Sequence, residues 1–218
     1  LASARLRNDF QYVVVAPALP LTTVMADDRG HWLPVIPGSD SALAMAMIRW
    51  IIENRRYNAD YLALPGAQAM RQAAEKSWTN ATHLVITDDQ PELAGQHLTL
   101  AHLNAEGASE PVVVNESGDV VAASGCPRGA LFVTRQLTLP DGRSVTVKSG
   151  FQLLKESAEK LTLTQYSQQC SVKVHIIDLQ LQAQLVSNSL CGLNVDALKF
   201  AGIGGHLVRG EGCVGGHD

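Results

Sequence analysis

The sequence lacks long apolar runs and blocks of charge of one sign. No stretch of about 18 apolar residues, the minimum for a membrane-spanning helix, occurs among the 218 residues. We therefore expect no direct insertion into a membrane. Its 17 basic and 21 acidic residues give a formal net charge of −4. Because they are dispersed, the chain has neither the basic stripe of a nucleic-acid-binding protein nor a polybasic membrane patch, and nucleic acid is excluded as an expected partner.

Cysteine is also scarce. The four cysteines are too few for a disulfide scaffold, and none forms the CxxC pair that would hold zinc or an iron–sulfur cluster: Cys126, Cys170, Cys191 and Cys213. Residues 202–207 fail the last position of the GxGxxG nucleotide loop. The Cys and His residues of the tail are too irregularly spaced for a zinc site: Cys191, His206, Cys213 and His217. We predict no catalytic residue and no metal ligand in this chain.

The first part of the sequence predicts alternating strands and helices. Phe10–Val15 is a short apolar run closed by a proline, typical of a buried strand in a parallel sheet. Helix formers fill Ser41–Asn54, with apolar residues at three- and four-residue spacing. Two short helices, Ala59–Leu64 and Gln68–Lys76, and a second buried strand at His83–Thr87 should follow.

The second part begins with short β segments that are separated by turn residues. They predict two β-hairpins, Val112–Val114 with Val120–Ala123 and Leu131–Leu139 with Val145–Val147. Helical periodicity then returns in three stretches: Phe151–Lys160, Thr164–Cys170 and Ile176–Val186.

This order of elements predicts an α/β fold: a partial parallel-sheet, dinucleotide-binding-like domain with a β-hairpin insertion and C-terminal helices. The expected boundaries are 1–94 for the α/β nucleotide-binding part, 95–149 for the β-rich insertion and 150–218 for a helical segment with a glycine-rich tail.

The step from Pro37 to Asp40 is the strongest candidate for a binding site. It leads into the long helix, where Ser39 is a plausible N-cap, and so places free backbone N–H groups beside the Asp40 carboxylate. A carboxylate accepts two parallel hydrogen bonds from N1–H and N2–H of guanine, whereas adenine offers no such edge. A capped helix with no ligand explains the same residues, so that alternative stays open.

Residues 13–62 carry a longer pattern around this step. A strand ends before a proline, then come Ala-Asp, Trp-Leu-Pro-Val-Ile-Pro-Gly-Ser-Asp, an alanine-rich helix and a Tyr-Asn segment. This pattern resembles the signature of the molybdopterin oxidoreductase family, whose Pro-Gly-Thr-Asp is matched here with the hydroxyl retained. Residues 55–70, 75–89 and 148–170 resemble its tetrathionate reductase branch in particular. The resemblance runs from about Asn8 to Leu179 and is weaker near residues 95–130.

The resemblance implies a cofactor and a site. In the family, the Gly-Thr-Asp step binds the guanosine end of a molybdopterin guanine dinucleotide, which carries over to Gly38, Ser39 and Asp40. Where the family has an aspartate before the proline that follows the strand, this sequence has Ala16, so that contact is lost. The molybdenum ligand and the cysteines of the 4Fe-4S cluster belong upstream of this segment in the family.

The resemblance further implies an internal fragment of a catalytic subunit whose intact form reduces tetrathionate or a related sulfur oxyanion in anaerobic respiration. By itself the fragment is expected to be inactive. Its partners would be the rest of that subunit, an electron-transfer iron–sulfur subunit and a membrane anchor subunit, and its location the periplasm. A non-catalytic α/β nucleotide-binding or interaction module is the alternative.

Overall fold

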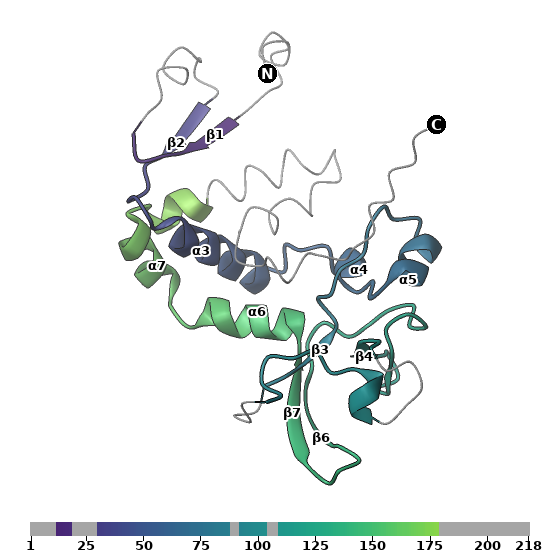
Figure 1. The fold of residues 1–218 in the computed structure, drawn as a ribbon. Helices are drawn as coiled ribbons and strands as arrows, with labels where there is room; N and C mark the ends of the chain where they lie inside the picture. Colours follow the sequence, from purple (N-terminus) through teal and green to yellow (C-terminus); the bar gives the residue numbers. More distant parts are fainter. Residues whose placement is uncertain (1–11, 19–29, 88–91, 104–108, 179–218) are drawn as a thin grey trace. The chain divides into compact units, whose positions relative to one another are not determined.

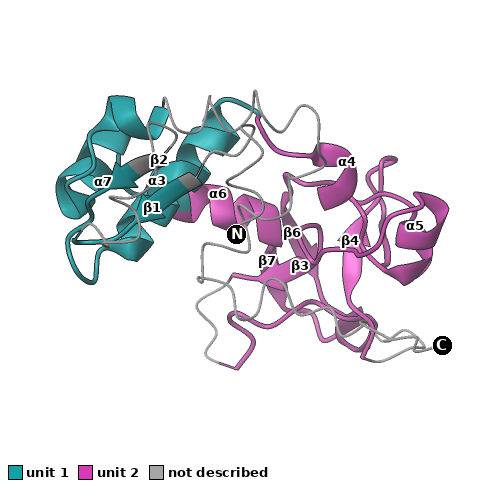
Figure 2. Cartoon of the chain, turned by 90° about the horizontal axis from the view of Figure 1, so that it is seen from above, with its two compact units in different colours: residues 1–55, 158–201 teal, residues 56–157, 202–218 magenta. Residues whose placement is uncertain are grey.

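The computed structural model describes residues 12–18, 30–87, 92–103 and 109–178 (Figure 1). The fold is mixed α/β, with three small sheets and short helices in this part of the chain. It divides into two compact units, coloured separately in Figure 2. Unit 1 comprises Leu1–Arg55 and Ala158–Ala201, and unit 2 comprises Arg56–Ser157 and Gly202–Asp218. The division at residues 94 and 149 stays a prediction. Among the described residues, no helix is long and apolar enough to cross a membrane.

Unit 1 combines a parallel strand pair with helices. The strand β1 (Tyr12–Val15) pairs in parallel with β2 (Gly30–Leu33). The second strand was not predicted from the sequence. The helix α3 (Asp40–Glu53) follows, and α7 (Leu163–Cys170) packs against it (Figure 1). Residues 174–178 are also helical, which confirms the start of the last predicted helix, whereas its remainder lies outside the described residues.

The core of unit 1 forms where α3 meets the residues after β2 and the C-terminal helices. Its buried members come from two distant stretches of the sequence: Leu33, Val35, Ala42, Leu43, Ala46, Trp50, Tyr166, Cys170, Val172 and Ile177. The alanines of α3 let the neighbouring helix approach closely, and burial of the large side chains drives the association.

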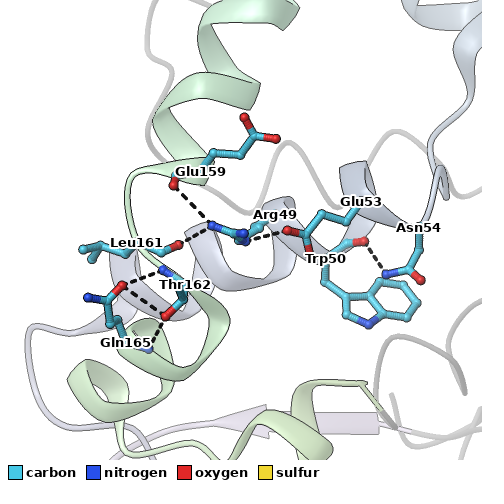
Figure 3. Close-up of polar contacts among 8 residues, drawn as sticks. All are labelled: Arg49, Trp50, Glu53, Asn54, Glu159, Leu161, Thr162 and Gln165. Carbon is cyan, nitrogen blue, oxygen red and sulfur yellow. Dashed lines mark hydrogen bonds and ion pairs between the residues drawn. The ribbon is translucent and has the colours of Figure 1, made fainter.

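Polar contacts of Arg49 join α3 to the segment before α7 (Figure 3). Its guanidinium donates to the carbonyl oxygens of Glu159 at 3.2 Å and Leu161 at 2.7 Å, and it pairs with Glu53 at 2.7 Å. A capping box at Thr162 and Gln165 then starts α7. The charge of Arg49 thus satisfies carbonyls at the end of a helix, where a cation is favoured.

Unit 2 contains the remaining elements, and the last residues of α6 already belong to unit 1. They are α4 (Ala59–Leu62), α5 (Ala67–Gln72), β3 (Leu84–Ile86), η1 (Leu100–Leu103), β4 (Val112–Val114), β5 (Val120–Ala122), β6 (Thr134–Thr138), β7 (Ser144–Ser149) and α6 (Gly150–Glu159). Both predicted hairpins are confirmed, because β4 pairs with β5 and β6 with β7, each antiparallel. In the second turn Gly142 has φ +84°, a value that favours glycine.

The strand predicted at His83–Thr87 is present as β3, but its partner is β7, which lies far along the sequence, in an antiparallel sheet of order β3-β7-β6. Valines of β7 alternate inward and pack with Leu84 and Ile86 of β3 in the core of this unit. Parallel pairing is therefore confined, among the described residues, to β1 and β2.

Candidate functional site

The segment from Ile36 to Ser39 is a tight turn. The Ser39 N–H donates to the Ile36 carbonyl at 3.0 Å, with Pro37 second and Gly38 third in the turn. Gly38 has φ +82°, the conformation that the third position of a type II turn requires. A Cβ placed on Gly38 would meet no atom within 4 Å, so the backbone angle alone demands glycine here.

Ser39 occupies the N-cap position of α3, as predicted, but its side chain does not cap the helix. Its hydroxyl instead donates to the Ile36 carbonyl at 2.6 Å, the same oxygen that accepts the Ser39 N–H. Ser39 is therefore the N-cap residue, but its hydroxyl does not cap α3, and the alternative of a helix start without a ligand stays open.

Polar groups at the start of α3 are left free by this arrangement. The N–H groups of Ala42 and Leu43 both donate to the Ser39 carbonyl, whereas those of Asp40 and Ser41 have no acceptor among the described residues. The Asp40 side chain is exposed and forms no ion pair or hydrogen bond within that same part of the chain. The helix N-terminus thus offers two donors and one carboxylate to an external molecule.

Ala16 and this turn lie at the same end of the parallel pair. Because β1 and β2 run side by side in register, Ala16 follows β1 where Pro34 follows β2. The Ala16 N–H donates to the Leu33 carbonyl at 3.2 Å, and the Trp32 indole N–H donates to the Ala16 carbonyl at 2.8 Å. The carboxyl ends of parallel strands are where ligands bind in open α/β sheets.

A main-chain hydrogen bond joins the turn to the end of α7. The Ile36 N–H donates to the carbonyl of Cys170, the last residue of α7, at 3.3 Å. Leu33 and Val35, which precede the turn, are buried in the same core as Cys170. No sequence pattern signals this contact, because it joins main-chain groups of residues that lie far apart in the sequence.

Other candidate chemistry is absent from the described part of the chain or lies outside it. The described residues contain no group of three or more His, Cys, Asp and Glu residues that could hold a metal. Residues 202–207 and the Cys and His residues of the tail lie outside the described residues. Within them, burial raises the pKa of the Cys126 thiol and lowers the pKa of His83, whose Nε2 lies 2.8 Å from the Pro65 carbonyl oxygen. Both side chains are buried, which suits structural roles.

Comparison with known proteins gives clear relatives. The chain is 70% identical over 172 residues to a tetrathionate reductase subunit of Salmonella typhimurium, covering 79% of this chain and 17% of the relative. It is 32% identical to a selenate reductase subunit of Mesobacillus selenatarsenatis (73% of this chain, 15% of the relative) and 31% identical to a tetrathionate reductase subunit of Archaeoglobus fulgidus (78% and 14%). The chain belongs to the molybdopterin oxidoreductase family. Its resemblance to the tetrathionate reductase branch is confirmed.

The comparisons also show how much of a whole protein this chain represents. No protein-family model matches the chain. The chain spans less than a fifth of the length of the relatives it matches, 17% of the Salmonella protein. The family relationship therefore describes this segment, and the activity of a whole protein is a separate question.

Proposed function

We propose that this chain forms part of the catalytic subunit of a molybdenum-dependent oxidoreductase that reduces tetrathionate or a related sulfur oxyanion in anaerobic respiration. The 70% identity to the Salmonella tetrathionate reductase subunit over most of the chain supports this proposal. Within the catalytic subunit, Gly38, Ser39 and Asp40 anchor the guanine end of molybdopterin guanine dinucleotide.

The uncapped start of α3 is the observation that carries the nucleotide proposal. The Ser39 hydroxyl is turned to Ile36. Among the described residues, the N–H groups of Asp40 and Ser41 have no acceptor and the Asp40 carboxylate has no partner. A helix N-terminus with free N–H groups attracts an electron-rich group, while a free carboxylate attracts adjacent N–H donors. Guanine offers both kinds of edge, with its O6 acceptor beside N1–H and N2–H.

These residues therefore fit the nucleotide end of the cofactor. Gly38 gives the turn its shape, Ser39 fixes it through two hydrogen bonds to one carbonyl, and Asp40 accepts from the guanine edge. When bound, the cofactor supplies the dithiolene sulfurs that hold molybdenum, the centre at which substrate is reduced. The role of this chain is to bind and orient the nucleotide tail.

The wider architecture belongs to the same proposal. The parallel β1–β2 pair followed by α3 is the part of a dinucleotide-binding-like domain that we assign to residues 1–94, with 95–149 as an insertion and 150–218 as a helical segment. The 4Fe-4S ligands lie elsewhere in the subunit. The partners are the rest of that subunit, an iron–sulfur electron-transfer subunit and a membrane anchor subunit, and the location is the periplasm.

Isothermal titration of the full 218-residue chain with GDP and ADP tests the anchor. We expect GDP to bind more tightly than ADP, and Asp40→Asn to weaken GDP binding by about tenfold or more, as loss of a charge-assisted hydrogen-bonded pair predicts. Asp60→Asn is the matched control, because Asp60 is also exposed in the first turn of a helix but pairs with Arg128. Equal affinity for GDP and ADP, or equal effects of the two variants, would refute the assignment.

The enzyme proposal is tested in the intact protein that contains this chain. We expect tetrathionate-dependent oxidation of a reduced viologen dye, and a lower molybdenum and pterin content in Asp40→Asn than in Asp60→Asn. An intact protein that carries pterin and molybdenum but leaves tetrathionate unreduced would contradict the substrate assignment.

A further inference from the structure

We infer that the end of α7 positions the nucleotide-binding turn, so that Ser171, which lies far from that turn in sequence, sets how Asp40 reads the base. This inference rests on the proposed function, because it concerns the same site. It names Ser171 as a positioning residue that itself touches no ligand.

The first step is the hydrogen bond from the Ile36 N–H to the Cys170 carbonyl at 3.3 Å. Ile36 begins the turn that carries Gly38 and Ser39, and its own carbonyl accepts both hydrogen bonds from Ser39. Ile36 therefore links the turn to the end of α7. A change in the direction of the Cys170 carbonyl would be passed directly to this turn.

The second step is the backbone of Ser171. Ser171 follows Cys170 as the C-cap of α7 and has φ +58°, ψ +16°, in the left-handed region that residues other than glycine and asparagine seldom adopt. The Cys170 carbonyl belongs to the peptide plane between these two residues, so the φ of Ser171 helps to set its direction. The left-handed Ser171 ends α7 and leaves that carbonyl free for Ile36.

The third step is that Cys170 and residues on both sides of the turn belong to one core. Cys170 is fully buried, and it belongs to the same core as Leu33 and Val35, which precede the turn, and Leu43, which follows it. Ser171 is exposed, so its side chain contributes no packing that a substitution would remove. Its effect on the turn must pass through the backbone.

The substitution Ser171→Val tests the inference in the full chain. A β-branched residue strongly disfavours positive φ, so the peptide before it should rotate. The readout is the affinity ratio of GDP to inosine diphosphate, which lacks the exocyclic amino group and so loses one of two hydrogen bonds to Asp40. We expect the parent chain to prefer GDP by about fivefold to tenfold and Ser171→Val to bring the ratio close to one. Ser171→Gly, which adopts positive φ readily, should keep the parent ratio.

Ala74→Val is the matched control for backbone strain. Ala74 is likewise exposed, follows a helix and has φ +54°, but belongs to unit 2. We expect it to lower the melting temperature about as much as Ser171→Val does while keeping the parent GDP preference. If Ser171→Val fails to fold, Ile36→Pro removes the N–H from the other end of the bond, with Ile36→Ala as its side-chain control.

The outcomes separate the two proposals. A folded Ser171→Val chain that keeps the parent ratio, or an Ile36→Pro chain that does so, overturns the positioning role and leaves the nucleotide site intact. A parent chain that binds GDP and inosine diphosphate equally overturns the reading of guanine by Asp40, and the positioning role with it. Loss of preference in Ser171→Val and its retention in Ser171→Gly and Ala74→Val supports the inference.

Discussion

Two serines precede helices in this chain and use their hydroxyls in opposite ways. In unit 2, Ser149 is buried before α6, and its oxygen accepts from the N–H groups of Gln152 and Val133 while its hydroxyl donates to Leu131. In unit 1, Ser39 precedes α3 and donates only to the turn behind it. Ser149 thus accepts a hydrogen bond from the first turn of α6, whereas Ser39 accepts none from the first turn of α3.

Two other helices, α4 and α7, are capped by the side chain of the residue at the N-cap. Asn58 caps α4 by accepting from the Tyr61 N–H at 3.0 Å, and Thr162 caps α7 through a capping box. A polar residue at an N-cap normally satisfies the first turn of its own helix. Ser39 differs, because its side chain accepts no hydrogen bond from α3. A helix whose first N–H groups lack a partner in the protein can donate them to a ligand.

The largest expected effect comes from removing the buried hydroxyl. Ser149→Ala should lower the free energy of unfolding by about 2–3 kcal/mol, because it removes the acceptor of the buried Val133 N–H and the donor to the half-buried Leu131 carbonyl. Ser39→Ala should lower it by less than about 1 kcal/mol, since that hydroxyl is only half-buried and supplements a backbone bond. Urea unfolding of both variants measures the contrast. Equal losses would mean that the two hydroxyls contribute alike.

The next effect concerns the turn itself. Gly38→Ala should cost about 1–2 kcal/mol, because alanine resists φ +82° although space for its methyl group is open. Gly125→Ala is the matched control, since Gly125 is also exposed with open space around it but lacks a positive φ. We expect this control to change stability by less than about 0.5 kcal/mol. Thermal unfolding compares them, and similar losses would remove the conformational argument for Gly38.

A smaller effect is expected at the start of α7. Thr162→Ala removes the capping box with Gln165 and should cost about 1 kcal/mol. Thr164→Ala, exposed in the first turn of the same helix, serves as control. Both variants should keep the preference for GDP, because the carbonyl that holds Ile36 lies at the other end of α7. A loss of that preference in Thr162→Ala would show that the whole helix, and not its end, positions the turn.

The smallest effect is a pH dependence confined to unit 2. Burial lowers the pKa of His83 below its ordinary value of 6.5, so below that pH the unfolded chain binds a proton that the folded chain resists. Stability should fall as pH drops through this range, by less than about 1 kcal/mol between about pH 7.5 and about pH 6.0. His83→Gln should lose this component in urea titrations at the two pH values. The same slope in both proteins would assign it to other groups.

Much of the fold could be predicted because its signals are local. The helix at Asp40–Glu53 and both hairpins follow from residue spacing and turn residues close in sequence. The strand Gly30–Leu33 was missed, since its four residues carry little β signal and it forms only by pairing with β1. The pairing of β3 with β7 was equally invisible, because periodicity does not specify partners.

In the candidate site, the residues were predictable from the sequence, but the direction of one side chain was not. Gly38, Ser39 and Asp40 were predicted from residue types and family resemblance, and the structure places all three at an exposed helix start. Their role in nucleotide binding stays a prediction. The direction of the Ser39 hydroxyl could not be read from the sequence, because an N-cap bond and a bond back to the turn are both open to serine.

By itself, the sequence determined the family of this chain, its local elements and the residue types at the corner, because each depends on residues close together in the chain. Only the tertiary structure decided that the end of α7 holds Ile36 and that unit 1 brings α3 together with α7. It also decided that the N–H groups of Asp40 and Ser41 find no acceptor among the described residues. The physical reason is that a backbone donor or acceptor takes whichever partner lies nearest in space, and residue identity specifies that partner only when it is also near in sequence.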